Sequence, residues 1–180
     1  GYGFPVKHQG RQFGDFPFAK VGDISTAARA GSRYLTAASN YVNESDLSTL
    51  KAEPFQRGTV AFAKIGEAIR QNFRVIADVD LLLDNNVMGL VPRAGIEPSY
   101  LFALMRVVDL YPMAQSTTVP SIRKSELARM PVPVPSSSLQ RRFVELDAAI
   151  IQRQSLLAES CIKADALCAS LQQRAFRGDL

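Results

Sequence analysis

Three aspartates, Asp78, Asp80 and Asp84, come nearer than any other residues of this chain to the spacing of a catalytic site. If the strand before them continued, Asp78 and Asp80 would lie on one face, and two carboxylates can hold Mg²⁺. A nuclease site of that kind usually adds a lysine or a third acid in register, and none is placed so here. We therefore favour an acidic strand end followed by a turn, and keep a nuclease as a minor alternative.

Other chemistry is weakly represented in the sequence. His8 is the single histidine, so it has no partner histidine for a metal site. The chain contains neither a G-x-x-x-x-G-K-[ST] phosphate loop nor a G-x-S-x-G nucleophile motif. Cys161 and Cys168 fall within a helical pattern, and two cysteines are too few for a disulfide framework. We expect no catalytic residues, no metal ligands, no cofactor and no enzymatic activity.

Positive charge is distributed unevenly along the chain. The whole carries 21 Lys and Arg against 17 Asp and Glu, a net charge of +4. Residues 5–35 and residues 56–76 are both basic, whereas residues 77–97 are acidic. Basic loops and strand ends can bind phosphates, and arginine can bind guanine through two hydrogen bonds. The side chains predicted from this distribution to contact DNA are Lys20, Arg29, Arg33, Lys64, Arg70 and Arg74.

The clearest element is a long C-terminal helix. The alternating prolines of residues 131–135 cannot continue a helix, whereas residues 139–176 contain no proline or glycine and end just before Gly178. Such a helix would be about 57 Å long, more than the width of a small domain, so we expect it to pair with another helix. Apolar residues recur along it every seven positions, a spacing typical of a helix-pairing seam. They are Phe143, Ile150, Leu157, Ala164 and Leu171.

The first part of the chain is predicted to be an α+β domain rich in β-strands. Strands are expected at residues 16–24, 58–66, 73–79 and 87–91, with a turn at residues 84–86. Helices are expected at 97–108, where Pro98 suits the first turn, and at 125–130. We place the domain boundary between a globular domain, residues 1–135, and a helical region, residues 136–180.

Composition excludes several classes of protein. With 47% hydrophobic residues the chain is too apolar to be disordered, and it has no apolar run of the length that spans a membrane. The sequence shows no signal peptide, so we expect no membrane association and a cytoplasmic location.

Taken together, the motifs resemble those of a specificity subunit of type I restriction-modification enzymes, over nearly the whole length. The most specific piece is a proline-alternating segment followed by a Gln-Arg-Arg helix start. One long helix joins these to a Phe-Arg-Gly-Asp-Leu ending. The lead-in at 135–140 departs from the family pattern, which more often has a second proline and an acidic residue before the glutamine. The segments that carry the resemblance are residues 1–4, 16–24, 63–67, 83–87, 98–102, 119–127, 130–135, 140–142 and 175–180.

The resemblance implies a non-catalytic target recognition domain that binds one half of a bipartite DNA sequence. It implies that the long helix pairs antiparallel with a second such helix, sets the spacing between two recognition domains and docks methyltransferase subunits, with a motor-nuclease subunit joining for restriction. This chain would be half of such a subunit, so the second helix would come from a second copy or from another half. The alternative from a different class is a protein-interaction adaptor that uses the helix for assembly and does not bind DNA.

Overall fold

The structure, a computed structural model, describes residues 1–115 and 118–179. It divides into two compact units, Gly1–Ser137 and Ser138–Leu180, two residues beyond the boundary that we placed after Pro135. The elements of the first unit are β1 (Phe16–Ala19), α1 (Val21–Arg29), β2 (Tyr34–Leu35), β3 (Tyr41–Val42), α2 (Glu44–Leu50), β4 (Val60–Ala63), β5 (Val75–Ala77), β6 (Leu82–Leu83), β7 (Val87–Leu90), α3 (Pro98–Val107) and α4 (Lys124–Ala128), with 3₁₀ turns η1 (Val6–His8), η2 (Glu67–Ile69) and η3 (Tyr111–Met113).

A four-stranded sheet with the order β2-β5-β4-β7 forms the centre of this unit. β4 is antiparallel to both of its neighbours, with Ala61 opposite Val75 and Ala63 opposite Val87, whereas β2 is parallel to β5. Successive side chains of a strand point to opposite faces of the sheet. Every residue of β4 is buried because both faces of this sheet are covered. Predicted strands 58–66, 73–79 and 87–91 correspond to β4, β5 and β7.

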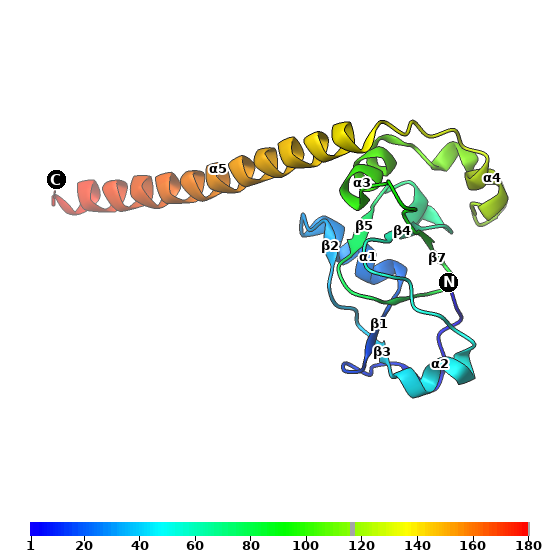
Figure 1. Ribbon diagram of the computed structural model, residues 1–180. Helices are drawn as coiled ribbons and strands as arrows, with labels where there is room; N and C mark the ends of the chain where they lie inside the picture. The colour runs from blue at the N-terminus through cyan, green and yellow to red at the C-terminus, as the bar shows by residue number, and fades with distance from the viewer. Residues whose placement is uncertain (116–117, 180) are drawn as a thin grey trace. The chain divides into compact units, whose positions relative to one another are not determined.

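The helices α1 and α3 cover opposite faces of this sheet (Figure 1). Ile24 of α1 packs with Ala61 and Val75, whereas Phe102 of α3 packs with Phe62 and Ile76. Neighbouring residues of β4 and β5 therefore pack in turn against α1 and against α3. This packing brings the C-terminal end of α1 and the last turn of α3 near the start of β5. α3 matches the helix predicted at 97–108, with Pro98 in its first turn, and α4 matches the one predicted at 125–130.

The prediction of one strand over residues 16–24 is half wrong. The strand ends at Ala19, and Val21–Arg29 is helical. The Asp23 carboxylate accepts a 2.8 Å hydrogen bond from the Lys20 backbone N–H, which satisfies a donor that the start of the helix would otherwise leave unpaired. β1 joins a second, three-stranded sheet with the order β3-β1-β6, in which Phe18 is buried.

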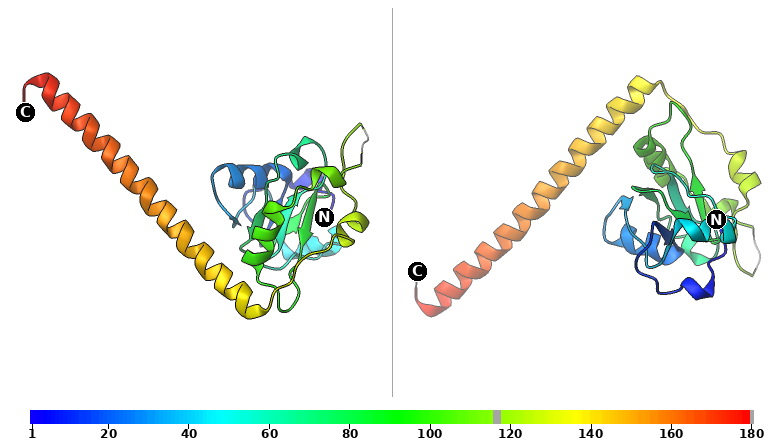
Figure 2. Two further views of the ribbon diagram at one scale, coloured as in Figure 1. Left: turned by 90° about the horizontal axis from the view of Figure 1, so that it is seen from above. Right: turned by 60° about the horizontal axis from the view of Figure 1, so that its bottom comes forward.

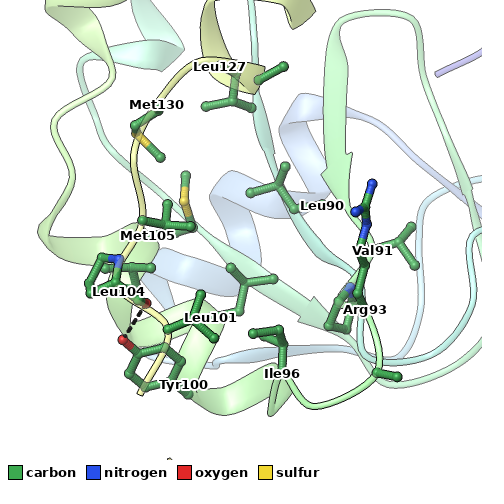
Figure 3. Close-up of a pocket in the computed structure, with 16 residues that line it drawn as sticks. Leu90, Val91, Arg93, Ile96, Tyr100, Leu101, Leu104, Met105, Leu127 and Met130 are labelled. Atoms are coloured by element: carbon green, nitrogen blue, oxygen red, sulfur yellow. Dashed lines mark hydrogen bonds between the residues drawn. The ribbon is translucent and has the colours of Figure 1, made fainter. Parts of the chain in front are cut away.

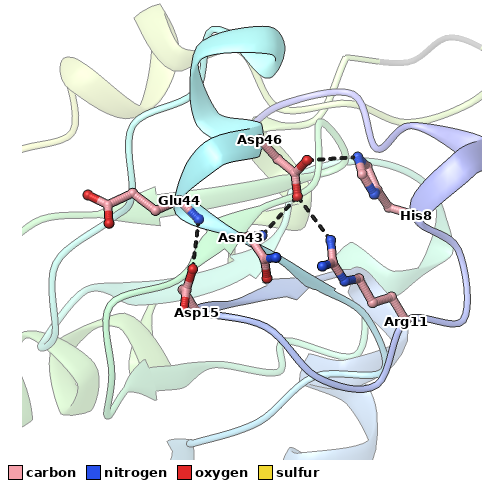
Figure 4. Close-up of polar contacts among 6 residues, drawn as sticks. All are labelled: His8, Arg11, Asp15, Asn43, Glu44 and Asp46. Carbon is pink, nitrogen blue, oxygen red and sulfur yellow. Dashed lines mark hydrogen bonds and ion pairs between the residues drawn. The ribbon is translucent and has the colours of Figure 1, made fainter.

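Helix α2, which the sequence did not predict, is held at its N-terminus by carboxylates from two directions (Figure 4). Asp46 accepts a 2.9 Å hydrogen bond from the Asn43 N–H and a 3.0 Å one from Arg11 Nη1, and lies 3.6 Å from His8 Nε2. Asp15 accepts from the Glu44 N–H at 2.9 Å. The hydrogen bond from Asn43, together with the charges of His8 and Arg11, lowers the pKa of Asp46. Asp46 therefore joins the N-terminal segment to α2.

The long helix is confirmed as α5, Ser137–Arg177, which runs unbroken in each view of Figure 2. It ends as predicted at Gly178, which has a φ of 78°. The Gly178 N–H donates to Ala175 O at 3.1 Å and the Asp179 N–H to Arg174 O at 2.9 Å, the two bonds of a Schellman cap. In the described part of the chain, no helix is both long and apolar enough to cross a membrane.

Candidate nucleic-acid interface

The two basic stretches of the sequence meet on one surface. Arg29, the last residue of α1, donates from Nη2 to Oε1 of Gln71 at 3.2 Å. Its guanidinium also lies 5.7 Å from the ring centroid of Phe73. Because Gln71 and Phe73 belong to the segment that leads into β5, residues 5–35 and 56–76 contribute to a single basic surface.

A second pair of arginines flanks the same segment. The guanidinium of Arg33, just before β2, lies 5.6 Å from the ring centroid of Phe102 on α3, and that of Arg106 lies 5.8 Å from the same ring. Asn72 donates from Nδ2 to the backbone carbonyl of Arg106 at 3.1 Å, which ties the last turn of α3 to the start of β5. Sequence reasoning missed Arg106 because it lies in an amphipathic helix outside the basic stretches.

Arg70 stacks on an aromatic ring. Its guanidinium lies 3.8 Å from the centroid of Tyr111, donates to the Tyr111 hydroxyl, and pairs with Glu67 at 3.0 Å. Its side chain is nevertheless 57% exposed. Residues 70–72 thus contact three elements, η3, α1 and α3, and they define what we name the arginine cluster. Its members are Arg29, Arg33, Arg70 and Arg106.

Arg74 requires a correction, because its burial argues against direct contact with DNA. It is 4% exposed, lies 4.8 Å from the ring centroid of Phe62, and donates to Phe73 O at 2.8 Å and to Asn72 Oδ1. Burial lowers its pKa to about 10, so the guanidinium stays charged at neutral pH. Asn72 has left-handed backbone, with a φ of 51°. Because Arg74 donates a hydrogen bond to its side chain from inside the fold, we regard Arg74 as a positioning residue that supports this turn.

The two predicted lysines have separate surroundings. Lys20 lies at the opposite end of α1 from Arg29, about 13 Å along the helix, with its Nζ 4.3 Å from the ring centroid of Phe4. Lys64 follows β4 and lines a depression shared with Gly1 and Lys124. Neither lysine belongs to the arginine cluster.

The aspartates considered for a metal site are engaged by Arg57. Its backbone N–H donates to Asp80 Oδ1 at 2.7 Å, and its guanidinium pairs with Asp78 at 2.9 Å. Asp84 is buried beside the 85–86 turn. Within residues 1–115 and 118–179, no group of three or more His, Cys, Asp or Glu side chains is placed to hold a metal ion. Asp78 and Asp80 therefore have a structural explanation, as partners of the Arg57 loop.

An apolar cavity of about 630 Å³ lies beside α3 and α4 (Figure 3). Its lining comes from the end of β7, from α3 and from residues 130–134, and includes Leu101 and Met105. The Tyr100 hydroxyl closes one side by donating to Pro133 O at 3.0 Å. Among the residues that the structure describes, Arg93 is the one charged residue that lines it, and they place no acid–base pair there.

Comparison with known proteins identifies the fold. No protein-family model and no curated protein sequence matches the chain. A structure described under "Structural basis underlying complex assembly and conformational transition of the type I R-M system" matches 100% of this chain and 43% of its own, with 20% identity and a TM-score of 0.70. The chain shares its fold with part of this type I R-M protein. The HsdS subunit from Thermoanaerobacter tengcongensis matches 100% of this chain and 42% of its own, with 19% identity and a TM-score of 0.63.

These likenesses confirm the predicted fold class, an α+β globular domain followed by one long helix. The chain spans less than half the length of either structure. Within the described residues, the HsdS-like fold carries an arginine cluster backed by aromatic rings on its globular unit and a helix with an exposed apolar seam. The arginine cluster and the apolar seam are therefore the two candidate binding surfaces.

Proposed function

We propose that this chain is a DNA sequence-recognition module of a type I restriction-modification specificity subunit, that it binds one half of a bipartite target, and that it catalyses no reaction itself. The observation that carries the proposal is the arginine cluster, assembled from both basic stretches on a fold of the HsdS type. Similarity of fold alone would suggest DNA recognition. The arginine cluster adds a positively charged surface that can bind the phosphates and bases of DNA.

The cluster suits nucleic acid for physical reasons. Guanidinium groups bind phosphate and guanine through paired hydrogen bonds, and they keep their charge at any physiological pH. Stacking on Phe73, Phe102 and Tyr111 limits their motion, so less side-chain entropy is lost on binding. Glu67, paired with Arg70, lowers the net charge locally and leaves Arg29 and Arg106 as exposed cations.

We keep Arg29, Arg33 and Arg70 in the proposed DNA-contacting set, add Arg106 and remove Arg74. Lys20 and Lys64 remain proposed contacts outside the cluster, reachable by DNA that extends beyond it. In such a surface most of the affinity comes from phosphates, and one or two side chains read bases at about 1–3 kcal/mol each.

The proposed partners follow from the second unit and from the family. The seam of α5 exposes Ile150 by 55%, Leu157 by 65% and Leu171 by 42%, a large apolar stripe for a free helix surface. We propose that another helix covers this seam, and that methyltransferase subunits, and a motor-nuclease subunit for restriction, assemble on the resulting scaffold. The type I R-M complex among the similar structures supports assembly of this general kind.

The test uses the full chain with its cognate methyltransferase and measures DNA affinity at several salt concentrations. Reversing two charges of the cluster, Arg29→Glu with Arg106→Glu, should weaken binding at least tenfold and flatten the salt dependence, because fewer counterions are released. Arg29→Glu alone is compared with Arg129→Glu, a control that reverses one charge at an 80% exposed arginine just after α4 and should change affinity much less. Equal effects of the cluster pair and the control would contradict the proposal.

The adaptor alternative has a distinct result. A chain that binds no DNA at any salt concentration, alone or with the methyltransferase, would favour an interaction adaptor. Mapping methylation in cells that express the chain with the methyltransferase would then show no new methylated sequence. A bipartite methylated sequence that disappears with the Arg29 and Arg106 variants would support recognition by this cluster.

A further inference from the structure

The two edges of the four-stranded sheet differ in how their backbone groups are satisfied. At the β2 edge, Ser32 Oγ donates to Tyr34 O at 2.8 Å and accepts from the Tyr34 N–H at 3.1 Å. These groups of Tyr34 point away from β5, because the carbonyls that accept from β5 are those of Arg33 and Leu35. One serine side chain therefore caps this edge against pairing with a further strand.

The opposite edge, β7, carries no such cap. Along an antiparallel ladder, hydrogen-bonded pairs alternate with non-hydrogen-bonded pairs. The Lys64 N–H donates to Asn86 O at 3.0 Å, so every second residue after Asn86 faces β4 and the residues between turn their N–H and C=O groups outward. The outward residues are Val87, Gly89 and Val91. Within the described residues, the outward groups of Gly89 and Val91 have no hydrogen-bond partner.

The sequence of β7 also lacks the usual protection of an edge strand. Edge strands commonly carry lysine or proline or form a bulge, and these features prevent pairing with another chain. β7 consists of Val-Met-Gly-Leu, and Gly89 is only half-buried. In the part of the chain that the structure describes, β7 pairs with β4 alone.

A groove lies along this open edge. The apolar cavity of about 630 Å³ and the depression of about 330 Å³ that Lys64 lines have three residues in common, so together they follow β7 from its start to beyond its end. The shared residues are Leu90, Leu127 and Ala128. Gly89 lines the depression without a side chain, so it contributes its backbone.

The far wall of the groove cannot close onto β7. It is formed by residues 130–134, in which every second residue is a proline without an N–H to donate. Leu90 lies across the cavity from Met130 in Figure 3. The space between the two walls therefore stays open to a strand from outside.

The lining of the groove suits apolar side chains. Leu101 and Met105 of α3 line the cavity, and three valines around it are unusually exposed for their type. They are Val91 at 45%, Val132 at 44% and Val134 at 60%. Phosphates and sugars would leave such a lining uncovered, whereas the apolar side chains of a peptide strand would bury it.

The charges at the two ends of the groove are positive. Arg93, beyond the end of β7, is exposed, and its side chain makes no hydrogen bond or ion pair with any described residue. Lys64 and Lys124 line the other end. None of the described lining residues is an aspartate or glutamate. This charge distribution is complementary to a peptide with an acidic residue near each end.

We propose that the open edge of β7 binds an extended peptide segment of another protein, which adds to the sheet as a further strand. Backbone groups of the peptide pair with Gly89 and Val91, and every second side chain is apolar and lies in the cavity against α3. Acidic side chains at its ends meet Arg93 and the two lysines. Binding by strand addition draws affinity from the backbone and specificity from pockets for alternate side chains. This interaction is separate from the proposed DNA recognition.

The test uses the full chain and a synthetic peptide, Asp-Thr-Val-Thr-Val-Thr-Glu, capped at both ends and labelled with fluorescein. At about 3.4 Å per residue it spans about 24 Å, enough to reach both ends of β7. Fluorescence anisotropy should show saturable binding. Replacing the central threonine by proline removes the N–H that would donate to Gly89 O, so that peptide should bind at least about fivefold more weakly.

The same backbone bond can be removed from the protein. Val91→Pro deletes an outward N–H that makes no bond to β4, and should weaken binding about 2- to 10-fold. Val91→Ala, which keeps the N–H, is the matched control and should retain more of the affinity. Urea midpoints of both variants show whether the fold is kept. The proline peptide tests the ladder with the wild-type protein, so its result does not depend on how a variant folds.

Charge complementarity has its own test. Arg93→Glu with Lys124→Glu should weaken binding of the acidic peptide about 3- to 30-fold, in line with exposed ion pairs. It should strengthen binding of Lys-Thr-Val-Thr-Val-Thr-Lys, whose ends have the opposite charge. DNA affinity of this double variant should equal that of wild type, because neither residue belongs to the arginine cluster.

Four results would overturn the proposal. They are no saturable binding of the acidic peptide to wild type, equal binding of the proline peptide, equal losses in Val91→Pro and Val91→Ala, and a double charge variant that loses DNA affinity but keeps peptide affinity. The last would assign the groove to the DNA surface. Each of these leaves the Arg29 and Arg106 test of DNA recognition unaffected, so the two proposals fail separately.

Discussion

Arg29 Nη2 donates a 3.2 Å hydrogen bond to Oε1 of Gln71, a residue 42 positions later in the chain. This contact joins the end of α1 to the segment before β5. The next residue, Asn72, is bonded in turn to α3 through the carbonyl of Arg106. A polar tripeptide, residues 70–72, therefore fixes the relative positions of arginines that come from three separate parts of the sequence.

Removing the acceptor should loosen this arrangement. We expect Gln71→Ala to reduce DNA affinity about 2- to 10-fold, because Arg29 would lose its orientation and ordering one such side chain costs about 0.5–1.5 kcal/mol. Both side chains are exposed, so the urea midpoint of unfolding should hardly change. Binding titrations at fixed salt provide the measurement. An unchanged affinity would mean that Arg29 needs no such orientation.

The buried Arg74 should behave differently from the exposed arginines. Arg74→Ala removes the donors to Phe73 O and Asn72 Oδ1 and the contact with the Phe62 ring, so we expect a loss of about 2–4 kcal/mol in the free energy of unfolding. Urea denaturation measures it. Arg129→Ala, at an exposed arginine, should change stability by less than about 0.5 kcal/mol. If the two variants were equally stable, Arg74 would not be supporting the turn.

The contrast between Arg74 and Arg106 shows what could and could not be predicted from the sequence. Counting charges along the chain located the basic stretches, but it could not tell that Arg74 points inward under Asn72. It also passed over Arg106, which lies 34 residues from Asn72 and meets it only through the packing of α3 on the sheet. Long-range packing decides both cases, and no local pattern encodes it.

Local patterns predicted α5 well because its signals are local. The prolines before it, the uninterrupted helix formers and Gly178 fix its length without help from tertiary contacts. α1 was mistaken for the continuation of β1 because Val21, Gly22 and Ile24 suit a strand end. The capping carboxylate of Asp23, three residues after Lys20, was the available signal for a helix start.

Stability should depend on pH through Asp46. Its pKa is lowered in the folded protein, so its ionised form favours folding above the unfolded pKa of about 4, and that contribution is lost as pH falls through the folded pKa. We expect Asp46→Asn to be less stable than wild type at pH 7, with the difference shrinking below about pH 4. Urea midpoints at pH 7 and pH 3 test this. A difference that stayed constant over that range would show that the charge of Asp46 is not the cause.

Two glycine-to-alanine substitutions should have opposite signs. Gly22 lies in α1, and a methyl group there would meet nothing within 4 Å, so alanine should stabilise by about 0.4–1 kcal/mol. At Gly89 in β7 the methyl group would lie 2.7 Å from Leu83 Cδ1 and 2.9 Å from Thr59 Cγ2, so we expect a loss of about 1–3 kcal/mol. Thermal unfolding of both variants distinguishes these results. Destabilisation by Gly22→Ala would argue against the helical start at Val21.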